Sequence, residues 1–364
     1  MTSHEFYMDL ALSNARAMKG QTDPNPLVGS VIVNDNRIVG VGTHLKAGEP
    51  HAEIHALQMS GDLAKGGTIY VTLEPCSHHG RTGPCAEAIV SAGLKRVVIA
   101  TLDPNPQVSG NGVKILEDAG IEVITGVCEK ESQEMNEVFN KYIIEKIPFI
   151  TLKSGITLDG KVATHTFNSK WITSEEARQD VHHLRNENMA ILVGINTAMK
   201  DDPALTTRIP NGRNPIRIVL DSTLKIPLDY QLVTDKQAET WIFTSKNYDR
   251  EKKTKLEALG IEIFVTSSET SVDPNEVVQI LGEKGIASLI IEGGGNVNAS
   301  FLENKLIDKV VLYFAPKIVG GRDAPTFLEG TGFELMKDAV ELTNTDFIRI
   351  GKDFKFIGYP SYEN

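Results

Sequence analysis

Cysteine is scarce in this sequence, with three residues among 364. Three thiols are too few for a disulfide framework, so the composition favours a reducing compartment and we expect a cytoplasmic protein. No stretch approaches the roughly 18 consecutive apolar residues that a membrane span needs. Residues 1–10 lack a basic region followed by an apolar run, so neither a secretory signal nor a membrane partner is predicted.

Positive charge is also in short supply. Lys and Arg number 37 against 48 Asp and Glu, which gives a formal net charge of −11. Affinity for a nucleic-acid backbone depends on clustered Lys and Arg. We therefore expect no nucleic-acid partner, whereas a local basic pocket for a small phosphorylated ligand is compatible with this balance.

The length of the chain suggests two domains, and both halves alternate strand and helix patterns, so the predicted fold class is α/β. A charged helical pattern over 129–145 ends just before Pro148, which predicts domains at 1–146 and 147–364. In the first half, strands are expected at 28–34, 37–41, 68–73 and 96–101, and helices at 6–19, 51–59, 85–92 and 113–119. In the second half, strands are expected at 149–152, 190–194, 216–221, 240–244, 261–265, 288–291 and 309–315, and helices at 174–185 and 250–258.

Four residues of the first half carry the strongest chemical signal: His51, Glu53, Cys76 and Cys85. One imidazole and two thiolates suit tetrahedral Zn²⁺ and leave a fourth position for water, whose pKa the metal lowers towards neutrality. Glu53 is the expected proton carrier for that water, as in zinc-dependent nucleobase deaminases. We therefore predict a hydrolytic deaminase with His51, Cys76 and Cys85 as metal ligands and Glu53 as the catalytic residue.

Two alternatives stay open at this point. Nucleobase deaminases usually separate the two cysteines by two residues, whereas eight residues separate Cys76 from Cys85. Two buried free thiols beside an unrelated histidine would give the same letters. A zinc-stabilised binding module would prefer four protein ligands and would not need Glu53.

Longer motifs surround these residues. The segments 25–29 (Asn-Pro-Leu-Val-Gly), 40–48, 51–53 and 74–85 resemble the deaminase half of the bifunctional RibD family of riboflavin biosynthesis, in which eight residues also separate the cysteines. The resemblance implies a cytidine-deaminase-like zinc domain that deaminates 2,5-diamino-6-ribosylamino-4(3H)-pyrimidinone 5′-phosphate. It also implies a substrate site lined by Asn25, His44, Arg81, Asp103 and Asn105.

The second half has no Gly-x-Gly-x-x-Gly after a strand, so a Rossmann dinucleotide site is not supported. It does contain three consecutive glycines, 293–295, between a predicted strand and a helical pattern. Such a turn lets backbone amides approach a pyrophosphate, although a tight turn without a ligand fits equally well. Lys153, Arg185 and Arg208 are candidates to hold a phosphate monoester, with solvated surface charges as the alternative.

These segments resemble the reductase half of the same family, which implies a dihydrofolate-reductase-like domain that uses NADPH. The implied reaction reduces the ribosyl chain of 5-amino-6-(5-phosphoribosylamino)uracil to ribityl. The resemblance assigns the loop 294–300 to the cofactor, together with Gly155, Trp171, Thr197, Asp201, Ser222, Gly294, Gly295 and Asn296. It assigns six residues to the substrate: Lys153, Ser169, Arg185, Leu205, Arg208 and Glu292.

Some points lie outside these motifs. Val297 stands where the family pattern suggests leucine, and we expect it to change packing only. Residues 244–246 (Thr-Ser-Lys) are our own hypothesis for a site of the cofactor's 2′-phosphate. The resemblance predicts a homo-oligomer. The remaining alternative is a zinc deaminase of another nucleobase fused to an inactive reductase-like domain.

Overall fold

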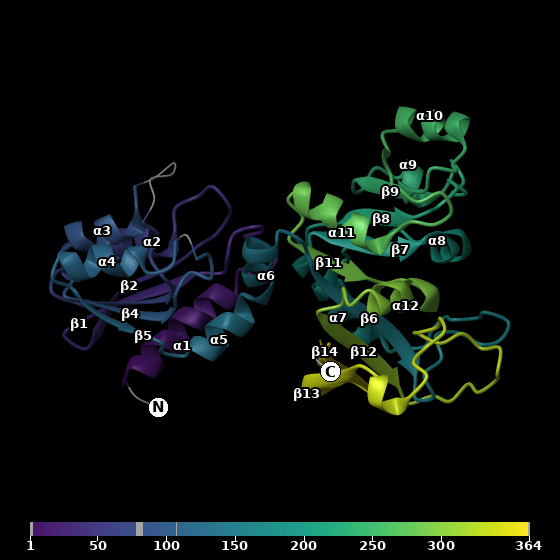
Figure 1. Cartoon of the computed structure of the whole chain (residues 1–364). Helices are drawn as coiled ribbons and strands as arrows, with labels where there is room; N and C mark the ends of the chain where they lie inside the picture. The colour runs from purple at the N-terminus through teal and green to yellow at the C-terminus, as the bar shows by residue number, and fades with distance from the viewer. Residues whose placement is uncertain (1–2, 78–82, 107, 363–364) are drawn as a thin grey trace. The chain divides into compact units, whose positions relative to one another are not determined.

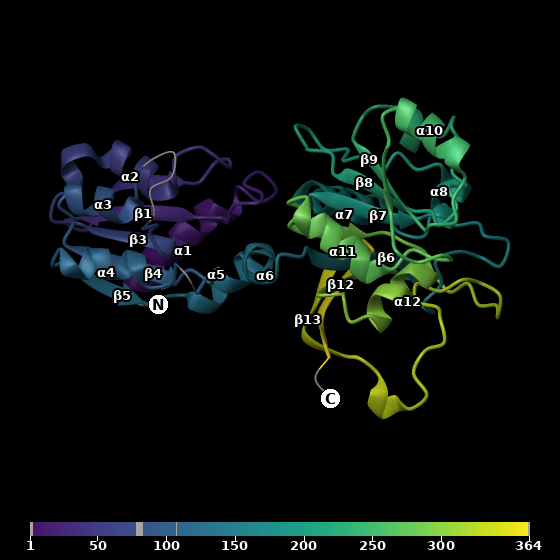
Figure 2. The ribbon, with the colours of Figure 1, turned by 45° about the horizontal axis from the view of Figure 1, so that its top comes forward.

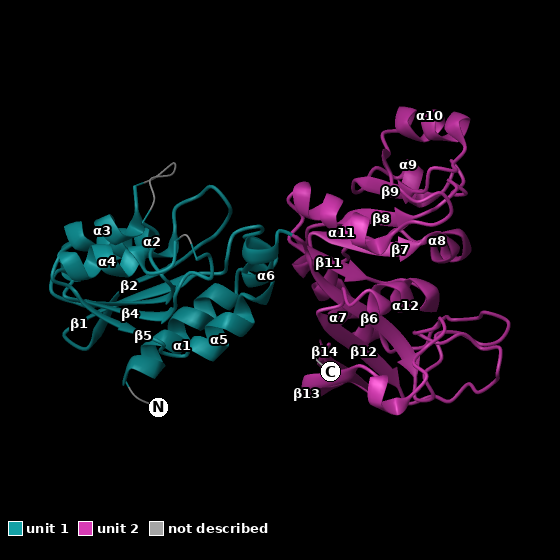
Figure 3. Ribbon diagram, viewed as in Figure 1, with its two compact units in different colours: residues 1–146 teal, residues 147–364 magenta. Residues whose placement is uncertain are grey.

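The computed structural model describes residues 3–77, 83–106 and 108–362. The chain divides into two compact units, Met1–Lys146 and Ile147–Asn364 (Figure 3). Within the described part of the chain, no helix is both long enough and apolar enough to cross a membrane. Arg81, one of the expected substrate residues, falls in the segment 78–82 and so lies outside the described residues.

Unit 1 is built on a five-stranded sheet with the order β2-β1-β3-β4-β5. Strand β1 pairs antiparallel with β2 and β3, whereas β3, β4 and β5 are parallel. The strands are β1 (Gly29–Asn34), β2 (Arg37–Thr43), β3 (Thr68–Leu73), β4 (Arg96–Thr101) and β5 (Glu122–Thr125). The helices are α1 (Ser3–Arg16), α2 (Ala52–Ser60), α3 (Cys85–Ser91), α4 (Asn111–Asp118), α5 (Glu129–Met135) and α6 (Glu137–Glu145), with a short 3₁₀ turn at Gly61–Ala64.

Helices cover both faces of this sheet, with α2, α3 and α4 on one face and α1 and α5 on the other (Figures 1 and 2). Successive strand residues point to opposite faces. In β3, Ile69 and Val71 accordingly pack in the core beneath α2 and α3, whereas Tyr70 packs in the core beneath α1. Burial on both faces explains why the parallel strands read as continuous apolar runs.

The single helix predicted over 129–145 is wrong, because the chain forms α5 and α6 with a break at Asn136. The Asn136 side chain is buried and forms two hydrogen bonds with the backbone of Leu27: its Oδ1 accepts from the Leu27 N–H at 2.8 Å and its Nδ2 donates to the Leu27 carbonyl at 3.0 Å. An asparagine side chain that satisfies a distant loop in this way competes with the helical ladder.

Unit 2 contains a nine-stranded sheet with the order β10-β9-β8-β7-β11-β6-β12-β14-β13. The first seven strands in that order are parallel, and β14 and β13 continue the sheet antiparallel. The strands are β6 (Phe149–Thr157), β7 (Ala190–Gly194), β8 (Ile216–Leu220), β9 (Thr240–Thr244), β10 (Glu262–Val265), β11 (Ser288–Ile291), β12 (Lys309–Ala315), β13 (Glu341–Ile350) and β14 (Asp353–Ser361).

Two helices, α11 (Pro274–Glu283) and α12 (Gly295–Glu303), pack on one face of this sheet, around Phe301. The opposite face is covered by four helices, and its core includes Leu232 and Leu256. These helices are α7 (Glu175–Glu187), α8 (Ile195–Asp201), α9 (Gln231–Thr234) and α10 (Arg250–Ala258). The sheet with helices on both faces confirms the predicted α/β class.

Candidate active sites

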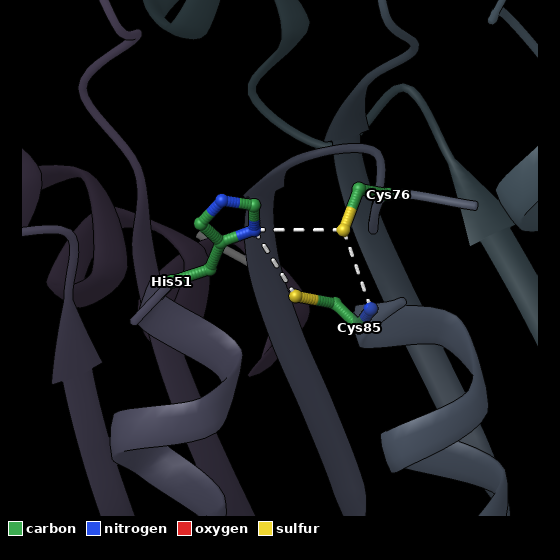
Figure 4. A group of neighbouring side chains, drawn as sticks. All are labelled: His51, Cys76 and Cys85. Carbon is green, nitrogen blue, oxygen red and sulfur yellow. Dashed lines mark hydrogen bonds between the residues drawn. The ribbon is translucent and has the colours of Figure 1, made fainter. Parts of the chain in front are cut away.

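The three expected metal ligands of unit 1 converge (Figure 4). His51 directly precedes α2, Cys76 lies in the loop after β3, and Cys85 is the first residue of α3. The His51 Nδ1 atom lies 3.2 Å from the Cys85 sulfur and 3.5 Å from the Cys76 sulfur, and all three ligand atoms lie within 4.8 Å of one another. Tetrahedral zinc with Zn–N and Zn–S bonds near 2.1–2.3 Å needs ligand separations of about 3.6 Å. The donor set therefore fits zinc with one open position.

Tight packing of α2 on the sheet fixes the position of His51. A Cβ atom on Gly42 of β2 would lie 2.1 Å from the Ala52 carbonyl oxygen, and one on Gly40 would lie 2.3 Å from the Ala56 carbonyl oxygen. Only glycine permits this approach of helix to strand. The first turn of α2, which carries His51 and Glu53, is thereby held against the sheet.

The thiols of Cys76 and Cys85 differ in pKa. The Cys85 side chain and its backbone N–H, which lies 3.3 Å from the Cys76 sulfur, donate to Cys76 and lower the pKa of that thiol to about 4, with a further contribution from His51. The pKa of Cys85 is raised by the same contact with Cys76 and by burial. Two sulfurs this close share one proton, because two neighbouring thiolates would repel each other. A bound cation would stabilise both thiolates.

Glu53 is the carboxylate of this site. Its side chain is buried, its Oε2 atom has no hydrogen-bond partner among the described residues, and burial raises its pKa to about 7. A buried polar atom without a partner is rare and implies a group that the protein alone does not provide. A carboxyl group that exchanges its proton near neutrality suits general acid–base work.

A cavity of about 290 Å³ opens onto His51, Glu53 and Cys76. Four of the expected substrate residues line the same cavity: Asn25, His44, Asp103 and Asn105. Asn25 Nδ2 lies 3.1 Å from His44 Nε2, and His44 Nδ1 lies 3.2 Å from the Pro50 carbonyl oxygen. Burial lowers the pKa of His44, so the ring is neutral and donates at Nδ1 while accepting from Asn25.

Glu74 is a buried residue to which the sequence analysis gave no role. Its carboxylate accepts hydrogen bonds from the backbone N–H groups of Asp103 at 3.2 Å, Gly110 at 3.0 Å and Gly112 at 2.9 Å. These bonds hold the loop after β4, which carries Asp103 and Asn105, against the metal-ligand loop. The position of Glu74 next to Pro75 and Cys76 was the one signal in the sequence, since its partners are 29 to 38 residues away.

Two cavities in the described part of unit 2, of about 600 Å³ each, share four of the expected site residues: Lys153, Gly155, Ser169 and Asp201. The first cavity, here called the glycine-turn cavity, contains most of the expected cofactor residues: Gly155, Thr197, Asp201, Ser222, Gly294, Gly295 and Asn296. The second, here called the arginine cavity, contains Trp171, Arg185 and Arg208. Leu205 is buried at a φ of 51° and lines neither cavity.

Glu292 lines the glycine-turn cavity and joins two of the expected phosphate-binding cations. Its carboxylate accepts from Arg185 Nε at 2.7 Å and Nη2 at 3.0 Å, and from Lys153 Nζ at 3.1 Å. Burial opposes ionisation of Glu292, but the charges of Arg185 and Lys153 outweigh burial and hold its pKa below the ordinary value. This carboxylate compensates part of the charge of the two cations, which no pattern in the sequence indicates.

The three glycines form the turn between β11 and α12, with Gly294 preceding the helix. A Cβ on Gly293 would lie 2.9 Å from Val297 Cβ, and one on Gly295 would lie 2.5 Å from Glu329 Cγ. Gly293 and Gly295 therefore have no room for a larger residue, and Val297 packs against the turn, whereas a Cβ on Gly294 would meet only Thr197 Oγ1, at 3.6 Å. Of residues 244–246, none lines either cavity; the Ser245 hydroxyl instead donates to the Ser222 carbonyl at 2.7 Å.

The geometry defines the class of protein. Unit 1 carries a His-Cys-Cys zinc site with a buried glutamate, as zinc-dependent deaminases do, and unit 2 carries a glycine turn beside a basic cavity, as expected for a nucleotide-dependent reductase. Residues 1–101 match the family model described as cytidine and deoxycytidylate deaminase zinc-binding region, and residues 148–356 match the RibD C-terminal domain.

Relatives extend along the whole chain. Riboflavin biosynthesis protein RibD of Bacillus amyloliquefaciens is 48% identical over 357 residues, which cover 98% of this chain and 96% of the relative. The RibD protein of Aquifex aeolicus is 50% identical over 315 residues, covering 86% and 87%. The chain belongs to the RibD family.

Solved structures agree with this assignment. Acinetobacter baumannii RibD superposes with a TM-score of 0.89 at 36% identity, covering 98% of this chain and 99% of that one. A Thermotoga maritima diaminohydroxyphosphoribosylaminopyrimidine deaminase/5-amino-6-(5-phosphoribosylamino)uracil reductase gives 0.84 at 36% identity, with the same coverage. The protein is a bifunctional deaminase and reductase of riboflavin biosynthesis, with a zinc-binding deaminase domain and an NADPH-dependent, dihydrofolate-reductase-like domain. The match along the whole chain favours this function over a deaminase of another base beside an inactive domain.

Proposed function

We propose that residues 1–146 deaminate 2,5-diamino-6-ribosylamino-4(3H)-pyrimidinone 5′-phosphate and that residues 147–364 then reduce the ribosyl chain of 5-amino-6-(5-phosphoribosylamino)uracil with NADPH. The observation that carries the first step is that His51, Cys76 and Cys85 converge as metal ligands, while His51, Cys76 and Glu53 line one cavity. The second step is supported by the glycine turn and the cations that line the two cavities of unit 2.

In the deaminase step, zinc held by His51, Cys76 and Cys85 would supply an activated water at neutral pH. Glu53 would carry one proton of the water to the ring nitrogen and then the proton of the added hydroxyl to the leaving amine, because its unpartnered Oε2 and raised pKa suit both directions of transfer. Neutral His44, hydrogen-bonded to Asn25 and to the Pro50 carbonyl, forms a fixed part of the cavity wall. The loop that Glu74 anchors positions Asp103 in the same cavity.

In the reductase step, NADPH held by unit 2 would supply a hydride directly to the substrate, so the protein mainly orients the two reactants. The residues proposed to bind the cofactor line the glycine-turn cavity, around Gly294 and Thr197. Arg185 and Arg208 suit a phosphate monoester through charge-assisted hydrogen bonds. Glu292 keeps Arg185 and Lys153 in fixed orientations between the two cavities.

We also propose that the protein is a homo-oligomer and that it acts in the cytoplasm. Strand β13 is the edge of the nine-stranded sheet, and it exposes Phe347 by 66% and Ile348 by 41%. Exposed apolar edge strands are ready to pair with another chain. Sedimentation at micromolar concentration checks the oligomer, and a monomer would contradict it.

The decisive experiment mixes the purified protein with the diaminopyrimidine ribosyl phosphate and NADPH, and follows ammonia and NADPH absorbance together. Ammonia release followed by NADPH consumption is the expected result. Ammonia without NADPH consumption would contradict the reductase assignment. Neither signal, from folded protein containing zinc, would contradict both assignments.

A further inference from the structure

One face of helix α7 lines the arginine cavity of unit 2. Arg178, Val181, His182 and Arg185 follow helical spacing, so their side chains lie on the same side of the helix, and all four line this cavity. Three of them are polar. His182 lies between the two arginines in the sequence, and the proposed reductase step gives it no role.

The two arginines are already engaged by neighbouring groups. Arg178 donates to the Thr173 carbonyl at 2.7 Å, and its guanidinium lies 4.6 Å from the centroid of the Trp171 ring. Arg185 donates to the Glu292 carboxylate and, from Nη1, to the Thr206 carbonyl at 3.0 Å. The Nδ1 atom of His182, in contrast, is buried and has no hydrogen-bond partner in the part of the chain that the structure describes. Buried polar atoms in native proteins are nearly always paired, so this face is completed by a group that the protein does not supply.

The surroundings of His182 decide which kind of group that is. Burial, the largest cause, and the charges of Arg185, Arg208 and Lys153 together lower its pKa to about 4, against a smaller opposing effect of Glu292. The ring is therefore neutral at physiological pH, with one nitrogen that donates and one that accepts. A neutral imidazole adds no charge for a phosphate, but a sugar hydroxyl, which both donates and accepts, matches it.

The position of His182 indicates that it contacts the substrate and not the cofactor. It lines the arginine cavity with Arg185 and Arg208, and it is absent from the lining of the glycine-turn cavity. We propose that His182 is a substrate-binding residue of the reductase, whose neutral imidazole hydrogen-bonds a hydroxyl group of the substrate's ribosyl chain. This inference rests on the proposed reductase function.

Steady-state kinetics of the full chain test the inference. His182→Leu should raise the KM for the deaminated ribosyl phosphate substrate about tenfold, the effect of one lost hydrogen bond, and leave the KM for NADPH unchanged. His183→Leu is the matched control, because His183 is the exposed neighbour on the same helix, and it should change neither value. Ammonia release, measured on the same preparations, checks that unit 1 of each variant is intact.

Deoxyribosyl analogues of the substrate make the test independent of folding, because KM does not depend on the folded fraction. One of the 2′-deoxy and 3′-deoxy analogues should have about a tenfold higher KM with the wild type and no further increase with His182→Leu. A wild-type KM for the substrate in His182→Leu would overturn the inference, and so would an increase confined to NADPH. Absence of NADPH oxidation in the wild type would instead overturn the proposed reductase function.

Discussion

Glu292→Gln is the substitution for which the structure allows the most detailed prediction. The Glu292 side chain is 11% exposed and faces Arg185 and Lys153, which are 13% and 14% exposed. The amide keeps the volume and one acceptor oxygen but removes the negative charge. Two largely buried cations are then left without their counter-charge.

Removing one partner of a buried ion pair destabilises a protein by about 3–5 kcal/mol. The remaining amide oxygen places Glu292→Gln near the lower end, about 3 kcal/mol. For a unit of this size each kcal/mol shifts the melting temperature by about 2–4 °C, so unit 2 should melt about 6–12 °C lower. NADPH oxidation should fall with it, because Arg185 and Lys153 lose the group that orients them.

Glu262→Gln is the matched control. Glu262 forms an equally short ion pair with Lys284, at 2.7 Å, but both side chains are about 45% exposed. An exposed pair contributes about 0.2–1 kcal/mol, so this variant should melt less than about 4 °C lower. Thermal unfolding followed by circular dichroism compares the two variants, and ammonia release shows that unit 1 is intact.

The pH dependence supplies a second readout. Because the pKa of Glu292 is lower in the folded protein, its stabilisation is fully present above the ordinary carboxyl pKa of about 4.3 and is lost as the pH falls below it. The difference between wild type and Glu292→Gln should be constant from pH 8 to 6 and should shrink below about pH 4. Equal losses in Glu292→Gln and Glu262→Gln at neutral pH would refute the reasoning.

Three further predictions concern unit 1. Glu53→Gln should abolish ammonia release while zinc content and NADPH oxidation of supplied deaminated intermediate are retained, with the exposed Glu49→Gln as control; loss of both activities would contradict the division into two sites. Chelation of zinc should remove ammonia release and spare NADPH oxidation and the fold, whereas unfolding of unit 1 would favour a structural zinc. Glu74→Gln should lower kcat for deamination at least tenfold, since the amide cannot accept all the N–H groups that now hold the Asp103 loop, and it should leave zinc content unchanged by metal analysis.

Some of the secondary structure could be predicted from the sequence, because its signal is local. The strand before Cys76 and the helix after His51 follow from short apolar patterns, and the glycine turn before α12 follows from its position after an apolar run. Strand β13 was missed, because its residues are mostly exposed and show no alternation of apolar and polar side chains. The break at Asn136 was missed because it depends on hydrogen bonds to Leu27, 109 residues away.

The sequence by itself determined the chemistry that each unit has available: the soft ligands, the carboxylate beside them, the glycines of the turn and the cations of the second half. Ligand type and local spacing decide these, and both can be read along the chain. Only the tertiary structure decided the charge balance and the orientation of the sites. Glu292 meets Arg185 and Lys153 across 107 and 139 residues. The packing around α7 leaves the Nδ1 atom of His182 without a hydrogen-bond partner among the described residues. Such pairings arise where strands and helices pack together, and no pattern within a single segment specifies them.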